Sequence, residues 1–481
     1  FFKRTMQPCL PHHTKRQKLC LSTRQQELFD YVSRTRQLSL TETNVHDVQV
    51  IHSALNNPTN PPRARVLQFY QLHHHDEFIR KIVGAKFPHA EEIWLQNCTI
   101  QCPQTMEALS EFLQNTTAIK SVHFDGFKVS CDESFQYIGQ ALAVNPSLTT
   151  LRLSNMKLSP IMLQSLNQAL NQNDILTKLW MHRVKFLDRN SLDTTLENVV
   201  NHTTEIRWYP VPNDHIRALA RALDTAALTS RLRHLEVGSS ARSLVCLFKA
   251  LQQSKSVDHF ELSGFSYLCD NQVEALAGML NNNTVINGLF LRVCSGGNDA
   301  DDDVMMEGTN LRTNIRPMFH ALAHNDALHT LQLSHIVLCD NDIKVLADAL
   351  QKNTSLRELT VASANISNAG TKYLSRALRR NQSLTSLHLG DNSGITAIGL
   401  IELSKVLRIN TGLQYLDVGN DLASNEVAVQ AITQALQYNI SLHDLACDGG
   451  NGPDELERIM SMETRTSMRG KQTSPTILGL L

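Results

Sequence analysis

The sequence lacks the features by which secreted, membrane-spanning and redox-active proteins are commonly identified. Its 10 cysteines include no Cys-x-x-Cys pair, so the usual zinc and dithiol motifs are missing. No apolar run approaches the roughly 20 residues that a membrane-spanning helix needs, and no secretory leader is visible. We therefore expect reduced thiols, no membrane partner, and a cytoplasmic location with the nucleus as the alternative.

An excess of charge of either sign is also missing. Lys and Arg number 45 against 46 Asp and Glu, and aromatic residues make up 6% of the chain. This balance excludes nucleic acid or an anionic membrane as an expected main partner. Residues 1–24 hold six Lys or Arg and no acid, and we expect 1–31 to be a partly disordered basic leader.

Motifs that would carry chemistry are absent as well. We find no glycine-rich phosphate loop, no pair of histidines at zincin spacing and no Gly-x-Ser-x-Gly. The aspartates at 299–303 do not have the spacing of an EF-hand loop. The sequence thus predicts no catalytic, cofactor-binding or metal-binding residues, and the protein is not expected to be an enzyme.

What the sequence does contain is one short pattern many times over. Residues 145–158 read NPSLTTLRLSNMKL, residues 353–366 read NTSLRELTVASANI, and residues 381–395 read NQSLTSLHLGDNSGI. Neighbouring copies stand about 28 residues apart, and a fixed period of this kind is typical of a repeat array, in which length counts copies rather than domains. The copies that the Asn aligns begin at Asn145, Asn173, Asn353, Asn381, Asn410 and Asn439.

Each copy predicts one short strand and one helix. In the copy that starts at residue 145, Leu151 and Leu153 alternate as the inward side of a strand does. Leu163, Leu166 and Leu170 then recur at intervals of three and four, which indicates a helix with one buried stripe. The Asn that opens the next copy is expected to end the helix, because Asn tolerates the left-handed conformation.

The pattern L-x-x-L-x-L followed by a helix, at this period, resembles the ribonuclease-inhibitor-like leucine-rich repeat. The resemblance implies an α/β solenoid shaped as a horseshoe, with a parallel sheet on its concave face and helices on its convex face. It covers residues 32–452 in about 15 units, with an acidic insertion at 295–314, and 453–481 form a cap remnant and flexible tail. Degenerate copies lie near Leu38, Leu67, Ile93, Val122, Ile206, Leu235, Phe260 and Leu289.

One departure from the family concerns the position three residues after the last strand leucine, where Asn or Cys is common. Cys98, Cys294 and Asn392 keep that pattern. An apolar spine is expected to replace the hydrogen-bonded ladder at the other copies, which have Phe127, Met156, Val184, Phe265, Ile336 and Ala364.

Two further residue types recur with the repeat. Cys131, Cys269 and Cys339 occupy one repeat position, each before an Asp, and we expect them to be small apolar plugs in the core. Of the eight Asn-x-Ser/Thr sequons, five fall at or near the Asn that opens a copy. The repeat itself therefore generates them, and they do not indicate glycosylation.

Alternation along each strand predicts which side chains face the concavity. Several are Trp, Tyr, Phe, Arg or His, and Trp, Tyr and Arg dominate the binding energy of protein interfaces. Trp208 is expected to point into the core with the strand leucines, unless it and Arg207 exchange faces. We expect these to bind a partner: Trp94, His123, Arg152, Trp180, His182, Arg207, Tyr209, His234, Glu236, His259, Glu261, Phe290 and Arg292.

The sequence therefore favours a non-enzymatic scaffold that binds a protein partner on the concave sheet, centred on Trp180, His182, Arg207 and Tyr209. One alternative is a regulator of a small GTPase, since a similar array forms the Ran GTPase-activating family. That family carries an acidic tail, whereas the tail here holds Arg465, and we transfer none of its functional residues. Another alternative is the sensing array of a larger NOD-like receptor or effector, since the chain begins at Phe1 without Met.

Overall fold

The computed structural model describes most of the repeat region. The described residues are 31–32, 34–56, 63–85, 89–188, 191–239, 242–293, 313–419 and 426–446, together with 28 and 87. The expected basic leader, the acidic insertion and the C-terminal tail lie outside them, apart from four residues at their edges. Within the described ranges, no helix combines the length and apolar character that crossing a bilayer would require.

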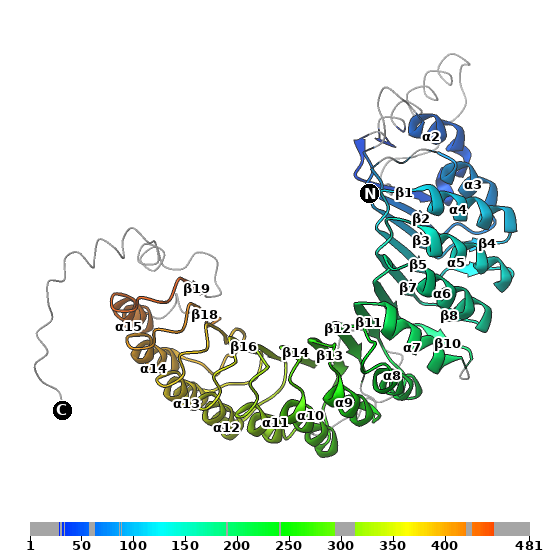
Figure 1. The fold of residues 1–481 in the computed structure, drawn as a ribbon. Coiled ribbons are helices and arrows are strands. Elements are labelled where there is room, and N and C mark those ends of the chain that lie inside the picture. Colours follow the sequence, from blue (N-terminus) through cyan, green and yellow to red (C-terminus); the bar gives the residue numbers. More distant parts are fainter. Residues whose placement is uncertain are drawn as a thin grey trace, which may run out of the picture. The chain divides into compact units, whose positions relative to one another are not determined.

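The chain divides into two compact units, and the first spans residues 1–203. Its main strands are parallel and pair in chain order. The helices lie on one side of this sheet, and we call the uncovered side the open face (Figure 1). The alternating elements are β1 (Gln37–Thr41), α2 (Val48–Leu55), β2 (Val66–Tyr70), α3 (Asp76–Val83), β3 (Glu92–Gln96), α4 (Pro103–Asn115), β5 (Ser121–Asp125), α5 (Phe135–Val144), β7 (Thr150–Ser154), α6 (Pro160–Gln172), β9 (Lys178–His182) and α7 (Leu192–His202).

The second unit, residues 204–481, repeats the same arrangement. Its strands are also parallel and neighbours in sequence, and its helices again cover one side of the sheet (Figure 1). The elements are β11 (Glu205–Tyr209), α8 (Asn213–Thr225), β12 (His234–Gly238), α9 (Leu244–Gln253), β13 (His259–Phe265), α10 (Asp270–Asn282), β14 (Gly288–Val293), α11 (Arg316–Leu322), β15 (Thr330–Ser334), α12 (Asp340–Leu350), β16 (Glu358–Ala362), α13 (Asn368–Leu378), β17 (Ser386–His388), α14 (Ala397–Leu407), β18 (Tyr415–Asp417), α15 (Glu426–Leu436) and β19 (Asp444–Ala446).

The fold class expected from the sequence, an α/β leucine-rich-repeat solenoid, is confirmed. Leu151 and Leu153 of β7 are each 1% exposed, and the leucines of α6 that recur at three and four are at most 3% exposed. The strand leucines stack in register, as Leu151 does on Leu179. Each repeat thus buries its strand and helix against its neighbours, which one repeat cannot do alone.

The apolar spine is confirmed where the structure describes it. The six residues expected there, Phe127, Met156, Val184, Phe265, Ile336 and Ala364, are all buried. Asn392 keeps the hydrogen-bonded version: its Nδ2 donates to the carbonyl of Val361 at 2.7 Å, and its Oδ1 accepts from the N–H of Ala364 at 2.9 Å. Cys294 lies outside the described residues.

The expectation for the recurring cysteines was wrong, because they cap helices instead of filling the core. Cys131 and Cys269 are exposed and Cys339 is half-buried. Cys269 and Cys339 are the N-caps of α10 and α12. The N–H of Cys339 donates to Asp342 three residues later at 2.9 Å, so the Cys position faces the unpaired backbone groups of the helix start.

Asp342 also pairs with Arg316, whose Nε donates to its Oδ1 at 2.7 Å. Burial raises the pKa of Asp342. The hydrogen bonds from Cys339 and from the guanidinium lower it, and together they outweigh the effect of burial. The net shift of this pKa is downward, so the carboxylate is charged in the folded protein at neutral pH.

The asparagine that opens each copy was also misjudged. Asn145, Asn173 and Asn283 follow their helices in extended conformations, not in the left-handed one. Their side chains are buried and bond to the preceding repeat. Asn353, for example, donates from Nδ2 to the carbonyls of Leu322 and Asn325, both at 2.8 Å. The repeat thus keeps this Asn for a buried ladder of amides between copies.

Candidate functional site

The structure places all thirteen expected partner-binding residues on strands or strand ends, with side chains that are half-buried or exposed beside buried apolar residues. The register predicted from alternation is therefore right, including Arg207, which is exposed, and Trp208, which is 1% exposed. Five of the residues belong to the first unit and eight to the second. The four residues expected at the centre are thus split between the two units.

On the first unit, four of the expected residues form one row. Trp94 of β3, His123 of β5, Arg152 of β7 and Trp180 of β9 occupy equivalent positions, each paired in register with the next. We call them the Trp94 row. His182 is exposed two residues beyond Trp180, opposite Ser154.

Contacts within the Trp94 row hold its side chains in place. The guanidinium of Arg152 lies 4.1 Å from the centroid of the Trp180 ring, a cation–π contact. The rings of Trp94 and His123 meet edge to face, with centroids 5.2 Å apart. Trp94 Nε1 also donates to Glu92 at 2.8 Å. The row is therefore an ordered surface before any partner arrives.

Burial lowers the pKa of His123, against the opposing effect of the Asp125 carboxylate. Its Nε2 lies 2.9 Å from the hydroxyl of Ser154. His123 is thus neutral at neutral pH, and the positive charge of the row comes from Arg152.

A basic pocket lies at the start of the strands in the same unit and was not predicted. Its volume is about 540 Å³, and it is lined by five Arg and Lys side chains with one carboxylate, Glu91. Arg65 lies 3.8 Å from Glu91. A signal was present, because Arg-x-Arg occurs at 34–36 and again at 63–65, in successive copies. The cations are Arg34, Arg36, Arg63, Arg65 and Lys120, joined by His89.

On the second unit, six of the eight expected residues form two rows. Arg207, Glu236, Glu261 and Phe290 are paired in register on β11, β12, β13 and β14. Two residues earlier, His234 pairs with His259. Their rings stack with centroids 5.0 Å apart, and His259 stacks in turn on Phe290 at 4.6 Å.

The charges of these rows are arranged around two glutamates. Arg207 Nε lies 2.7 Å from Glu205 and 3.5 Å from Glu236. Arg292 Nη2 lies 3.5 Å from Glu261. Burial raises the pKa of Glu236, and the charge of Glu261 raises it further. The two carboxylates thus repel each other, and the nearby arginines attract them.

Tyr209 has a packing role that its sequence position did not reveal. A Cβ added to Gly238 would lie 1.7 Å from Tyr209 Cδ2, and one added to Gly264 would lie 2.6 Å from Cε2. The ring therefore rests directly on the backbone of two neighbouring strands. Glycine is required at 238 because no side chain fits beneath the ring.

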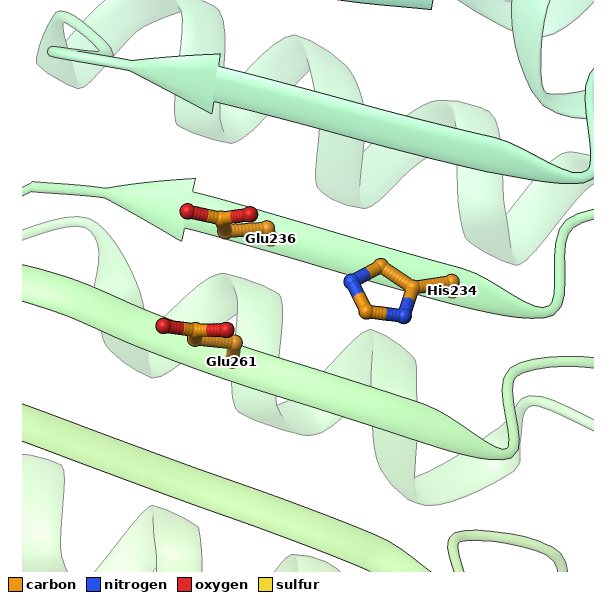
Figure 2. Close-up of side chains that lie close together, drawn as sticks. All are labelled: His234, Glu236 and Glu261. Carbon is orange, nitrogen blue, oxygen red and sulfur yellow. The ribbon is translucent and has the colours of Figure 1, made fainter. Parts of the chain in front are cut away.

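His234, Glu236 and Glu261 also form the group of metal-ligating side chains found within the described ranges. One ligand atom from each lies within 4.8 Å of the other two. Figure 2 shows both carboxylates next to the imidazole. The sequence carried a signal for this group too, because His-x-Glu occurs at 234–236 and again at 259–261.

Comparison with known proteins adds little to this description. No family model matches the chain, and no curated protein does. Among solved structures, actin-binding site 2 of leiomodin-1 shares 15% identity over 32% of this chain and 90% of its own, with a TM-score of 0.29. The tropomodulin C-terminal domain of Caenorhabditis elegans shares 15% identity over 33% of this chain and 96% of its own, with a TM-score of 0.29. A chain from the yeast Rad7 and Elc1 complex shares 13% identity over 86% of this chain and 94% of its own, with a TM-score of 0.37.

Proposed function

We propose that this protein is a non-enzymatic scaffold that binds a protein partner through the open faces of its leucine-rich repeats. We further assign the repeats to the ribonuclease-inhibitor-like class, because the period is about 28 residues and full α-helices such as α6 follow the strands. The thirteen predicted partner-binding residues remain the proposed contact set. The Trp94 row is its centre on the first unit.

The observation that carries this proposal is the composition and order of the Trp94 row. Two Trp, one Arg and one His lie side by side on four strands, which at about 4.8 Å per strand span roughly 14 Å. Trp and Arg are enriched among residues whose truncation at an interface costs about 2 kcal/mol or more. Because Arg152 already stacks on Trp180, little side-chain entropy remains to be lost on binding.

The basic pocket indicates the charge of the partner. Glu91 in its lining precedes Trp94 by three residues, or about 10 Å along the strand. The five cations of the pocket, at the start of strands of the same sheet, attract a partner whose surface is acidic beside its contact with the row. Such rim charges affect the rate of association more than the rate of dissociation.

Partner capture from cytosolic extract tests the proposal. The intact chain is compared with a Trp94→Ala, Trp180→Ala double variant and with a control variant, Gln332→Ala, Thr360→Ala. The control residues occupy the same strand position on the second unit, where they are also half-buried. Each variant is used only if its melting temperature matches that of the intact chain.

We expect the intact chain and the control variant to retain the same partner protein, and the double variant to lose it. Equal retention by all three chains contradicts the proposed centre. A small GTPase among the retained proteins, with nucleotide hydrolysis that the chain accelerates, would favour the GTPase-regulating alternative. A nucleotide-binding module encoded before Phe1 in the full-length transcript would favour the larger-receptor alternative.

A further inference from the structure

On the open face of the second unit, we propose that His234, Glu236 and Glu261 form a binding site for a divalent transition-metal ion such as Zn²⁺. The three side chains come from two adjacent strands, β12 and β13, in which Glu236 and Glu261 are register partners. Figure 2 shows the ring nitrogen of His234 that is farther from its Cβ turned toward the two carboxylates. The proposal does not rest on the proposed protein binding, although its three residues also belong to the contact set proposed above.

The unsatisfied imidazole nitrogen is the first argument. His234 Nε2 is enclosed and has no hydrogen-bond partner within the described part of the chain. A buried polar atom of this kind costs free energy unless a water, a ligand or an ion satisfies it. Neutral imidazole nitrogen is a common ligand of Zn²⁺ and related ions.

The distances are the second argument. The three ligand atoms lie within 4.8 Å of one another. Atoms bound to one tetrahedral ion at about 2.1 Å are about 3.4 Å apart, so rotations of the two Glu side chains close the remaining gap. The ring of His234 is held by its stack on His259, and the strands fix the positions of all three residues. The site is therefore nearly formed before an ion binds.

The repulsion between the two carboxylates also favours a bound cation. Like charges directly opposite each other on neighbouring strands destabilise a sheet, and Glu236 and Glu261 are in that position. Arg207 and Arg292 approach them only to 3.5 Å, which is longer than an ordinary N–H···O hydrogen bond of about 2.7–3.2 Å. A cation between the carboxylates removes their repulsion, while the positive charges of the two arginines oppose its binding.

His388 provides a matched contrast on the same face. Its Nε2 lies 3.7 Å from Glu358, but its Nδ1 lies 3.9 Å from Asp417. The two carboxylates sit on opposite nitrogens, so they do not converge on a single point as those of His234 do. Composition alone therefore does not make a metal site, and His388 serves as the control.

The test is calorimetric titration of the intact, chelator-treated chain with zinc chloride, repeated with Co²⁺ to record its visible absorption. His234→Gln, Glu236→Gln and Glu261→Gln are compared with the control His388→Gln. We expect one ion per chain, and a loss of about 100-fold or more in affinity in each of the three variants, since even outer-shell partners account for about 10- to 100-fold. The control is expected to bind like the intact chain.

Variants of the flanking arginines add a result in the opposite direction. Arg292→Gln removes a positive charge next to Glu261 and is expected to tighten Zn²⁺ binding. The proposal is overturned if the intact chain takes up no ion, or if the ion it takes up is bound equally well by all three ligand variants. Glu→Gln preserves shape and the sites are partly exposed, so unchanged melting of the metal-free variants shows that any loss of binding is local.

Discussion

The buried amide ladder gives the sharpest prediction for stability, and Asn353 is the place to test it. Its Nδ2 donates to two carbonyls of the preceding repeat. Its Oδ1 accepts from the N–H of Ser355 at 3.1 Å and of Leu356 at 2.8 Å. Asn353 is 3% exposed, so water does not replace these bonds without local opening. We expect Asn353→Ala to destabilise the second unit strongly.

The size of this stability loss follows from the backbone groups that the substitution leaves without a hydrogen-bond partner. The carbonyl of Asn325 still accepts from the hydroxyl of Ser355 at 2.9 Å, and that of Leu322 still accepts from the N–H of Asn325 at 3.3 Å. Two buried N–H groups, those of Ser355 and Leu356, lose their acceptor. At about 1–3 kcal/mol for each unpaired N–H group, the free energy of unfolding falls by about 2–6 kcal/mol.

Denaturant unfolding followed by circular dichroism measures this loss, with the exposed neighbour Thr354→Ala as control. A loss near 3 kcal/mol corresponds to a melting temperature about 6–12 °C lower for a unit of this size. Because repeat arrays can unfold in parts, amide exchange of residues 353–357 is followed as well. A change below about 1 kcal/mol, with unchanged exchange, would refute the ladder as a major source of stability.

Three further predictions concern single side chains. Burial raises the pKa of the Cys98 thiol to about 11, so in the native protein at pH 8 iodoacetamide is expected to label the exposed Cys131 and leave Cys98 unmodified, as mass spectrometry would show. Gly238→Ala is expected to destabilise the protein by clash with Tyr209, whose Cδ2 would lie 1.7 Å from the new Cβ, and adding Tyr209→Ala should restore part of the loss in a thermal melt. The folded-state pKa of Asp342 is lowered by its hydrogen bonds and ion pair, which outweigh its burial; it therefore contributes stability above the ordinary carboxyl pKa of about 3.9 that is lost as pH falls through the folded value. Asp342→Asn should thus be less stable than the intact chain at pH 7, and the difference should shrink on acidification below about pH 4; a difference independent of pH would contradict this origin.

The sequence was sufficient for the fold and for the orientation of side chains, because both depend on periodicity within one copy. The alternation around Leu151 and Leu153 identifies Arg152 as outward-facing, and the same rule holds for Trp94 and Trp180. A leucine that returns once in every copy of the repeat specifies its own burial against the next copy.

The features that sequence reasoning missed depend on contacts between copies. The amide of Asn353 bonds to carbonyls 28 and 31 residues earlier, and no local pattern indicates such partners. Cys339 was judged by its apolar character, whereas its place directly before a helix start decides its role. Tyr209 was judged by its type, although its ring fills the space above Gly238.

The two charged clusters were visible only as short motifs that recur in successive copies of the repeat. Arg34 and Arg36 have counterparts at 63 and 65, and His234 and Glu236 have counterparts at 259 and 261. In a parallel solenoid, a motif that occurs in successive copies becomes a patch of adjacent side chains. Searching for repeated polar pairs, in addition to repeated leucines, would have found both.

The most direct test of the proposed function is the affinity of the captured partner for the purified chain and its Trp94→Ala variant. The account predicts that the variant dissociates faster and binds about 30-fold more weakly, as a loss of about 2 kcal/mol at the centre of an interface implies. The Gln332→Ala, Thr360→Ala control should bind like the intact chain. Equal affinity of the Trp94→Ala variant and the intact chain would contradict the claim that the Trp94 row is the binding centre.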